Sequence, residues 1–184
     1  MDQFRRYPGT THFGLRIVKG DVFDSGTFHP VMEGKDAVVS ALGVQQRKPT
    51  TVYSQGTRNI MEGMYKYGVK RLICVSSSAL ELPPQTPFLS RFFLEQFLKR
   101  LLKNLYADME RMEHAVRRSD LDWSVIRPPR LTNGPVTHNY RISVNEPMVK
   151  PKMIRGVSRA DVADCIVSQL NNSASLHGVI EISY

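Results

Sequence analysis

The chain has 184 residues, and 41% of them are hydrophobic, which is ordinary for a soluble globular protein and enough for one domain with its own core. No apolar run approaches the roughly 18 residues of a membrane-spanning helix, and no secretory signal is recognisable, so we expect a cytoplasmic protein without a membrane span. The formal charge of +8 favours anionic partners. The basic residues are scattered among acidic ones, however, and no nucleic-acid motif is present, so nucleic acid is not an expected partner.

The first part of the chain is expected to be a flexible polar arm, residues 1–14, followed by a single domain over residues 15–184. A short β-branched run predicts a strand over residues 15–19. A weaker pattern predicts a short helix over 25–33, closed by a glycine. The next apolar run predicts a second strand over 36–42, which ends in Gly43.

A helix is predicted next, with Thr50 or Thr51 as its N-cap and Gly68 as its terminator. A third strand is predicted over 71–76. Three prolines in residues 81–87 lack backbone donors and therefore predict a loop over the strand ends.

The clearest helical pattern covers residues 88–118, where apolar side chains recur every three or four residues. This stripe predicts core packing, although basic residues beside it leave open a helix that binds a partner or a membrane surface. The stripe consists of Leu94, Leu98, Leu102, Leu105, Met109, Met112 and Val116.

The last third of the chain alternates again between strand and helix. Strands are expected over 121–127 and 140–144, and Ser158 is expected to cap a helix over 159–170. The tail 178–184 has strand character and is expected to add an edge to the sheet. The whole pattern predicts an α/β fold with a mostly parallel sheet, in which ligands bind beyond the carboxyl ends of the strands.

Polar residues follow each predicted strand, where a nucleotide would lie. The Asp21 carboxylate can accept from an adenine amine, and the Val22 backbone can pair with a ring nitrogen, although an aspartate here can equally cap a turn. Gly43 allows close backbone approach. Ser76–Ser78 can hydrogen-bond a nicotinamide or a substrate, and Arg130 can pair with an anionic group or simply face solvent.

Familiar proton-transfer sets are missing from the sequence. No tyrosine is followed four residues later by lysine, and the five histidines lack metal-ligand spacing. Cys74 and Cys165 each lie in an apolar run and are expected to be buried thiols. Hydrolysis and phosphoryl transfer are thereby disfavoured, whereas hydride transfer to an electron-poor acceptor remains, because the cofactor supplies that chemistry.

Six segments in this order resemble one family, the atypical short-chain dehydrogenases/reductases whose NAD(P)H-binding domains are similar to flavin reductase and biliverdin-IXβ reductase. The resemblance implies a Rossmann-like domain that reduces a flavin or a tetrapyrrole-like acceptor with NADPH, with NAD as a further option. The segments are VKGDV (18–22), DAVVSALG (36–43), SQGTRNI (54–60), VKRLICVSSSA (69–79), YADMERME (106–113) and LDWSVIRPPRL (121–131).

The family's functional positions carry over residue by residue. The resemblance implies two candidates on the substrate side, Ser77 and Arg130, the latter at a position that is histidine in the biliverdin reductase. The implied cofactor contacts are Asp21, Val22, Ala41, Leu42, Gly43, Ser76 and Pro128.

One feature of the family is missing. Members begin with a strand, a Gly-x-x-Gly-x-x-Gly turn and a helix that binds the pyrophosphate, whereas no two glycines are three apart here. Arg5 or Arg6 is either a remnant of the basic position for the adenosine 2′-phosphate or part of the arm. We therefore expect an N-terminally truncated Rossmann-like domain with unpaired strand edges. A non-catalytic relative, which binds dinucleotide or a partner protein, and an incomplete gene product stay open as alternatives.

Overall fold

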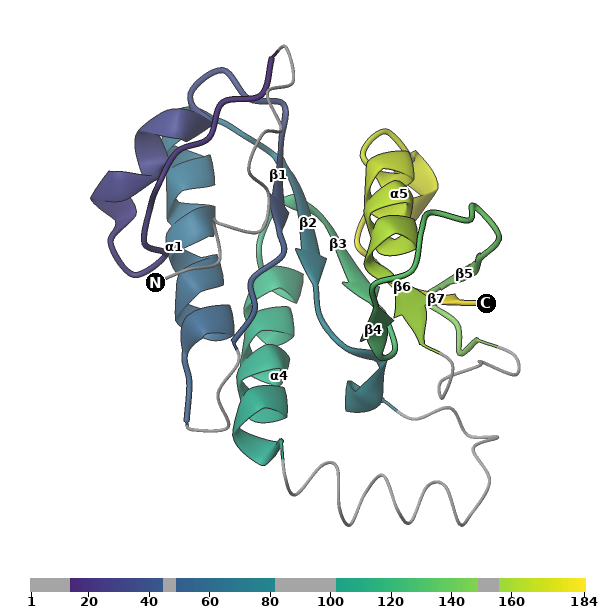
Figure 1. The fold of residues 1–184 in the computed structure, drawn as a ribbon. Coiled ribbons are helices and arrows are strands. Elements are labelled where there is room, and N and C mark those ends of the chain that lie inside the picture. Colours follow the sequence, from purple (N-terminus) through teal and green to yellow (C-terminus); the bar gives the residue numbers. More distant parts are fainter. Residues whose placement is uncertain (1–13, 45–48, 82–101, 149–155) are drawn as a thin grey trace.

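The computed structural model describes residues 14–44, 49–81, 102–148 and 156–184, and its centre is a five-stranded sheet in the order β1-β2-β3-β7-β5 (Figure 1). The first four of these strands are parallel, and β5 pairs antiparallel with β7. The strands are β1 (Ala37–Ser40), β2 (Arg71–Val75), β3 (Asp122–Arg127), β7 (Gly178–Ser183) and β5 (Arg141–Val144). A second small sheet pairs β4 (Leu131–Thr132) in parallel with β6 (Val157–Ser158).

Helices cover both faces of the sheet. The α1 (Val52–Tyr67) and α4 (Lys103–Arg117) helices pack together on one face, and α5 (Arg159–Gln169) lies on the other (Figure 1). Four 3₁₀ turns complete the description: η2 (Ser25–Thr27), η3 (His29–Met32), η4 (Ser78–Leu80) and η6 (Ser173–Ser175). The predicted α/β class with a mostly parallel sheet is confirmed.

Alternating side chains of β2 explain why its sequence is apolar throughout. Leu72 and Cys74 belong to the core beneath α1 and α4, whereas Ile73 belongs to the core beneath α5. All three are fully buried. A parallel strand with helices on both faces has no solvent side, so an uninterrupted apolar run is what such a position requires.

Two predicted helix signals are confirmed by their geometry. Gly68 ends α1 in the left-handed region, with φ of +72°, and donates its N–H to carbonyls of the last turn. The Ser158 hydroxyl accepts from the backbone of Asp161 and caps α5. At the start of α1 the N-cap residue is Thr51, whose side chain makes no capping hydrogen bond. The Thr50 hydroxyl, one residue earlier, accepts from the Val52 N–H at 3.2 Å.

The predicted strand over residues 15–19 is wrong. These residues form no ladder, and the side chains of Leu15 and Ile17 are 55% and 67% exposed. A strand exists only when a neighbouring backbone accepts and donates its hydrogen bonds, and no described segment pairs with this one. The outer edge of β1 likewise has no partner among the described residues, and Val39 is 43% exposed.

The tail strand is also placed differently from the prediction. It forms β7, which pairs with β3 on one side and with β5 on the other, so it is interior and β5 is the edge. Several predictions fall outside the described residues: the arm over 1–13, the proline loop over 82–87 and the first part of the helix over 88–101.

Candidate functional site

The loops after β1, β2 and β3 meet at one edge of the sheet, because the three strands are neighbours and run in the same direction (Figure 1). Two of these loops are joined by their backbones. The Ser76 N–H donates to the Ile126 carbonyl at 2.8 Å, and the Ser78 N–H donates to the Pro128 carbonyl at 3.0 Å. The parallel register therefore places the serine segment directly beside Pro128.

Val22 and Leu42 come together at Gly56, near the start of α1. A Cβ on Gly56 would lie 2.8 Å from Val22 Cγ2 and 3.0 Å from Leu42 Cδ1, so only a glycine leaves room for both side chains. The Asn59 side-chain amide donates to the Val22 carbonyl at 2.8 Å and holds this turn on the helix. Two predicted contacts on the adenine side, Val22 and Leu42, thus share one helical support.

Asp21 has a structural role that the sequence left open. Its Oδ1 accepts from the Phe23 N–H at 2.9 Å, and its own N–H donates to the Thr27 hydroxyl at 2.9 Å. The aspartate therefore caps a turn. Its second carboxylate oxygen and the Val22 N–H have no hydrogen-bond partner among the residues that the structure describes.

Ser77 lies beside Tyr106, a residue that the sequence patterns did not single out. The Ser77 hydroxyl accepts from the Ala79 N–H at 3.2 Å and caps η4. Burial raises the pKa of the Tyr106 phenol on α4, while a hydrogen bond with Ser77 lowers it less. The phenol therefore stays protonated near neutral pH. The tyrosine–lysine spacing did not identify Tyr106, because the residue four positions later is Glu110 and not a lysine.

A buried ion pair lies behind these loops. Arg127, the last residue of β3, donates from Nε to Glu113 Oε1 at 3.0 Å and from Nη2 to Glu113 Oε2 at 2.7 Å. Its Nη1 reaches Glu81 Oε2 at 2.8 Å. Burial raises the pKa of Glu113, but the hydrogen bonds and charge of Arg127 outweigh burial, so the pKa is lowered and the carboxylate stays ionised. No sequence pattern pointed to this pair.

A carboxylate from another helix occupies the N-terminus of α1. Asp108 of α4 is fully buried and accepts from the Tyr53 N–H at 2.9 Å and from the Ser54 hydroxyl. Arg111 pairs with the same carboxylate at 3.0 Å. The first-turn donors of α1, which begins at the carboxyl edge of the sheet, therefore serve Asp108.

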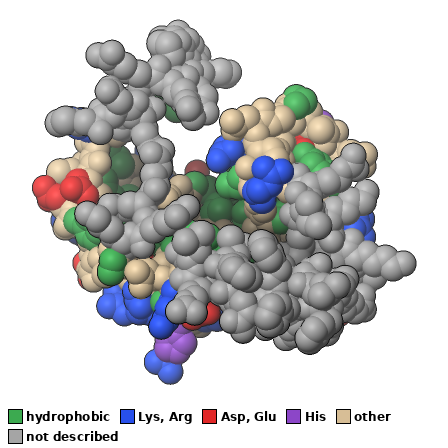
Figure 2. Space-filling view, turned by 60° about the horizontal axis from the view of Figure 1, so that its bottom comes forward, with side chains coloured by type: hydrophobic (Ala, Val, Ile, Leu, Met, Phe, Trp, Pro, Cys, Tyr) green, Lys and Arg blue, Asp and Glu red, His purple; other side chains and the backbone are tan. Residues whose placement is uncertain are grey.

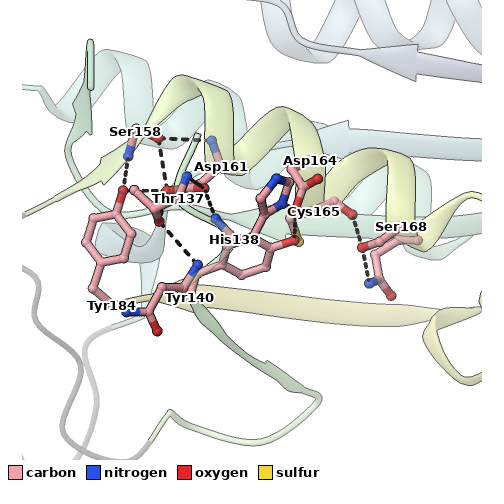
Figure 3. A network of polar contacts seen from close by, with 11 residues as sticks. Thr137, His138, Tyr140, Ser158, Asp161, Asp164, Cys165, Ser168 and Tyr184 are labelled. Carbon is pink, nitrogen blue, oxygen red and sulfur yellow. Dashed lines mark hydrogen bonds and ion pairs between the residues drawn. The ribbon is translucent and has the colours of Figure 1, made fainter. Parts of the chain in front are cut away.

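A second buried carboxylate, that of Asp161 in the first turn of α5, binds residues outside the helix (Figure 3). This buried carboxylate accepts from the Thr137 N–H at 2.7 Å, the His138 N–H at 3.0 Å and the Tyr184 hydroxyl at 2.6 Å. Burial raises the pKa of Asp161, but these hydrogen bonds outweigh it and hold the pKa well below its usual range. Nearby, the Tyr140 hydroxyl donates to Asp164 at 2.7 Å. The Ser-x-x-Asp spacing is the one local sequence signal for this network.

The remaining predicted site residues lie exposed at the carboxyl edge of the sheet. Ala41, Gly43 and Arg130 are exposed, and an added Cβ on Gly43 would meet no atom within 4 Å. The Arg130 carbonyl accepts from the Val157 N–H at 2.9 Å, so its backbone is fixed by β6 while its side chain has no partner within the described part of the chain. Figure 2, which brings this end forward, shows a hollow with a hydrophobic floor and basic side chains at its rim.

Other kinds of site find little support in the described residues. Within them, no three histidine, cysteine, aspartate or glutamate side chains are placed to hold a metal ion. Burial raises the pKa of Cys74 to about 12 and of Cys165 to about 11, so both thiols are protonated near neutral pH. None of the described helices is long and apolar enough to cross a membrane.

Comparison with known families agrees with this geometry. Residues 4–173 match the model of a family described as NAD(P)H-binding. The chain belongs to this NAD(P)H-binding family. The predicted NAD(P)H-binding family and the predicted Rossmann-like fold are confirmed.

Similar proteins include an uncharacterized chloroplastic protein, At2g34460, from Arabidopsis thaliana, which is 27% identical over 174 residues. That match covers 91% of this chain but 60% of the relative, so the chain spans about three fifths of the relative's length. A short-chain dehydrogenase/reductase from Veillonella parvula, solved in complex with NADP, superposes with a TM-score of 0.74 at 15% identity, covering 95% of this chain and 74% of that one. ChuY from Escherichia coli O157:H7, described as an anaerobilin reductase, superposes with a TM-score of 0.69 at 22% identity, covering 89% and 72%.

Proposed function

We propose that this protein is an NAD(P)H-dependent reductase that transfers a hydride to a flavin-like or other conjugated acceptor. The observation that carries the proposal is that three loops lie together at the carboxyl edge of β1, β2 and β3, the place where parallel α/β sheets bind nucleotides. Membership of the NAD(P)H-binding family supports it. A fold neighbour in complex with NADP favours NADP over NAD, and ChuY makes a tetrapyrrole-like acceptor a reasonable choice beside a flavin. The proposed compartment is the cytoplasm.

The residues at this edge fit the two ends of a dinucleotide better than its middle. At the adenine end, the free oxygen of Asp21 and the N–H of Val22 offer one acceptor and one donor. The space above Gly43 leaves room for a ribose. The Ser78 hydroxyl at the nicotinamide end, and the Ser40 hydroxyl at the end of β1, are buried without a hydrogen-bond partner among the described residues. Buried hydroxyls of this kind usually find one, which favours a polar ligand nearby.

In the proposed reaction the bound dinucleotide supplies the hydride, and the protein orients the reactants. Ser77 and Ser76 are assigned to hydrogen bonds with the nicotinamide or the acceptor. The partly buried Tyr106 phenol, which keeps its proton, is assigned to donate a hydrogen bond to the acceptor beside Ser77. The exposed Arg130 guanidinium is assigned to an anionic group of the acceptor.

A non-catalytic NAD(P)-binding or protein-interaction relative is the second candidate. The observation that favours it is that donors at two helix N-termini of this edge are already taken. Asp108 accepts from a first-turn N–H of α1, and the Ser158 hydroxyl accepts from a first-turn N–H of α5. Helix N-termini are common pyrophosphate sites, and the family's glycine turn is not found in the sequence. On this reading the protein binds the nucleotide weakly and does not turn over.

A two-stage titration separates the candidates. NADPH and NADH are titrated separately and followed by cofactor fluorescence and by thermal shift, and then the oxidation of NADPH is followed with FMN, riboflavin and biliverdin as acceptors. We expect saturable NADPH binding that is tighter than NADH binding, and turnover with at least one acceptor. Binding without turnover supports the non-catalytic candidate. No binding at millimolar cofactor contradicts the reductase and leaves the protein-interaction form of the second candidate.

A further inference from the structure

Arg127 connects three elements that carry the proposed site. It is the last residue of β3, immediately before Pro128. Its guanidinium binds Glu113 on α4, the helix of Tyr106, through two hydrogen bonds. The remaining nitrogen, Nη1, binds Glu81, the residue that closes the η4 turn behind Ser77.

The two carboxylates differ sharply in exposure. The side chains of Arg127 and Glu113 are 8% and 5% exposed, whereas that of Glu81 is 73% exposed. Arg117 approaches Glu113 at 3.4 Å, so two cations face two carboxylates and the cluster is neutral. A buried ion pair is seldom the most stable choice, because apolar residues of the same volume often stabilise the fold as well or better. Stability alone therefore does not account for the charges.

We propose that Arg127 and Glu81 form a positioning clamp that fixes the turn from Ser77 to Glu81 against Pro128 and Tyr106. The proposal rests on the proposed reductase function, since it assigns the clamp to the nicotinamide half of that site. The planar fork of arginine suits this task, because it holds one carboxylate with two nitrogens and reaches the second carboxylate with the third. Neither residue touches the reactants; both act through the backbone of the serine turn.

Glu81→Gln is the decisive variant, since it removes the charge of one arm and leaves the buried Arg127–Glu113 pair intact. Because Glu81 is exposed, we expect an unchanged melting temperature. We expect kcat for acceptor reduction to fall about tenfold, as small misplacements of reacting groups commonly do, while the Kd for NADPH changes less than about twofold. Glu81→Asp should recover part of the loss.

Glu110→Gln is the matched control. Glu110 lines the same shallow pocket as Glu81 and Arg127 and loses the same charge, but it has no partner among the described residues. We expect wild-type kcat for this variant. A wild-type kcat in Glu81→Gln, or an equal loss in both variants, overturns the clamp.

A readout without turnover separates failure of the clamp from failure of the proposed function. Amide hydrogen exchange of Ser78 and Leu80, whose N–H groups bond within this turn and to Pro128, should accelerate at least fivefold in Glu81→Gln and stay unchanged in Glu110→Gln. Unchanged exchange in Glu81→Gln contradicts the clamp even if the wild type proves inactive. Accelerated exchange in an inactive protein supports the clamp and removes the reductase.

Discussion

Gly56→Ala tests whether the adenine side of the proposed site depends on the contact of Val22 and Leu42 with α1. The added methyl group would lie 2.8 Å from Val22 Cγ2 and 3.0 Å from Leu42 Cδ1, well inside the 3.4 Å at which ordinary contact begins. Because valine is stiff at χ1, the Val22 turn has to move away from the helix. We expect the backbone donor and the carboxylate of that turn to leave their binding positions.

Gly56→Ala should change the free energy of unfolding only modestly, because two opposing contributions largely cancel. The free energy of NADPH binding has no such compensation. Overpacking costs about 1–3 kcal/mol, while replacing glycine by alanine inside a helix returns about 1 kcal/mol. The net loss of stability is therefore between zero and about 2 kcal/mol, which for a chain of this size lowers Tm by no more than about 8 °C. Displacement of the turn should raise the Kd for NADPH about five- to tenfold, equivalent to about 1–1.4 kcal/mol.

Gly63→Ala provides the matched control in the same helix. Its methyl group would lie 2.7 Å from atoms of His29 and Met32, so it overpacks α1 to a similar degree but away from Val22 and Leu42. Fluorescence titration of NADPH and thermal melts on both variants separate the two effects. Equal Kd values for the two variants, or an unchanged Kd in Gly56→Ala, would refute the assignment of this turn to the adenine.

Three further predictions concern stability and chemistry. Asp161→Asn loses charge-assisted hydrogen bonds and should lower the free energy of unfolding by about 2–3 kcal/mol at pH 7. The pKa of Asp161 is lower in the folded than in the unfolded state, so its contribution to stability is present above the unfolded pKa near 4 and is lost as pH falls. Urea titrations should therefore show the difference in unfolding free energy between the wild type and the Asn variant shrinking from pH 7 to pH 3. A constant difference contradicts this. Arg71→Met leaves the carbonyls at the end of α5 without their buried donor, and should lower the urea midpoint by an amount equivalent to about 2–4 kcal/mol; an unchanged midpoint contradicts it. Tyr106→Phe should reduce kcat for acceptor reduction about 10- to 100-fold with little change in NADPH affinity, and wild-type kcat would remove the phenol from the mechanism.

Local signals in the sequence were sufficient for most elements of the fold. Apolar runs predicted β1, β2 and β3 because each of these strands is bordered by clear turn or helix signals, and Gly68 and Ser158 marked helix ends through their own backbone and side-chain chemistry. The predicted strand over residues 15–19 is wrong for a reason that no local sequence pattern reveals. A strand depends on a partner, and no described segment supplies one.

The parts of the site that were missed depend on contacts distant in the sequence. Asp108 meets the start of α1 across 55 residues, and Arg127 meets Glu81 across 46. Neither pairing leaves a spacing that can be read along the chain. Tyr106 was missed for a different reason. The tyrosine–lysine spacing requires a lysine partner, whereas burial beside Ser77 is what keeps the Tyr106 phenol protonated.

The most direct test of the central claim is an NMR titration of the amide-labelled protein with NADPH. Binding across the carboxyl ends of β1, β2 and β3 predicts saturable shifts that concentrate at Val22, Gly43, Ser77 and Tyr106, with small changes at the opposite edge around Gly68 and Asp122. Shifts that concentrate at the opposite edge, or no shifts at millimolar NADPH, would contradict the account.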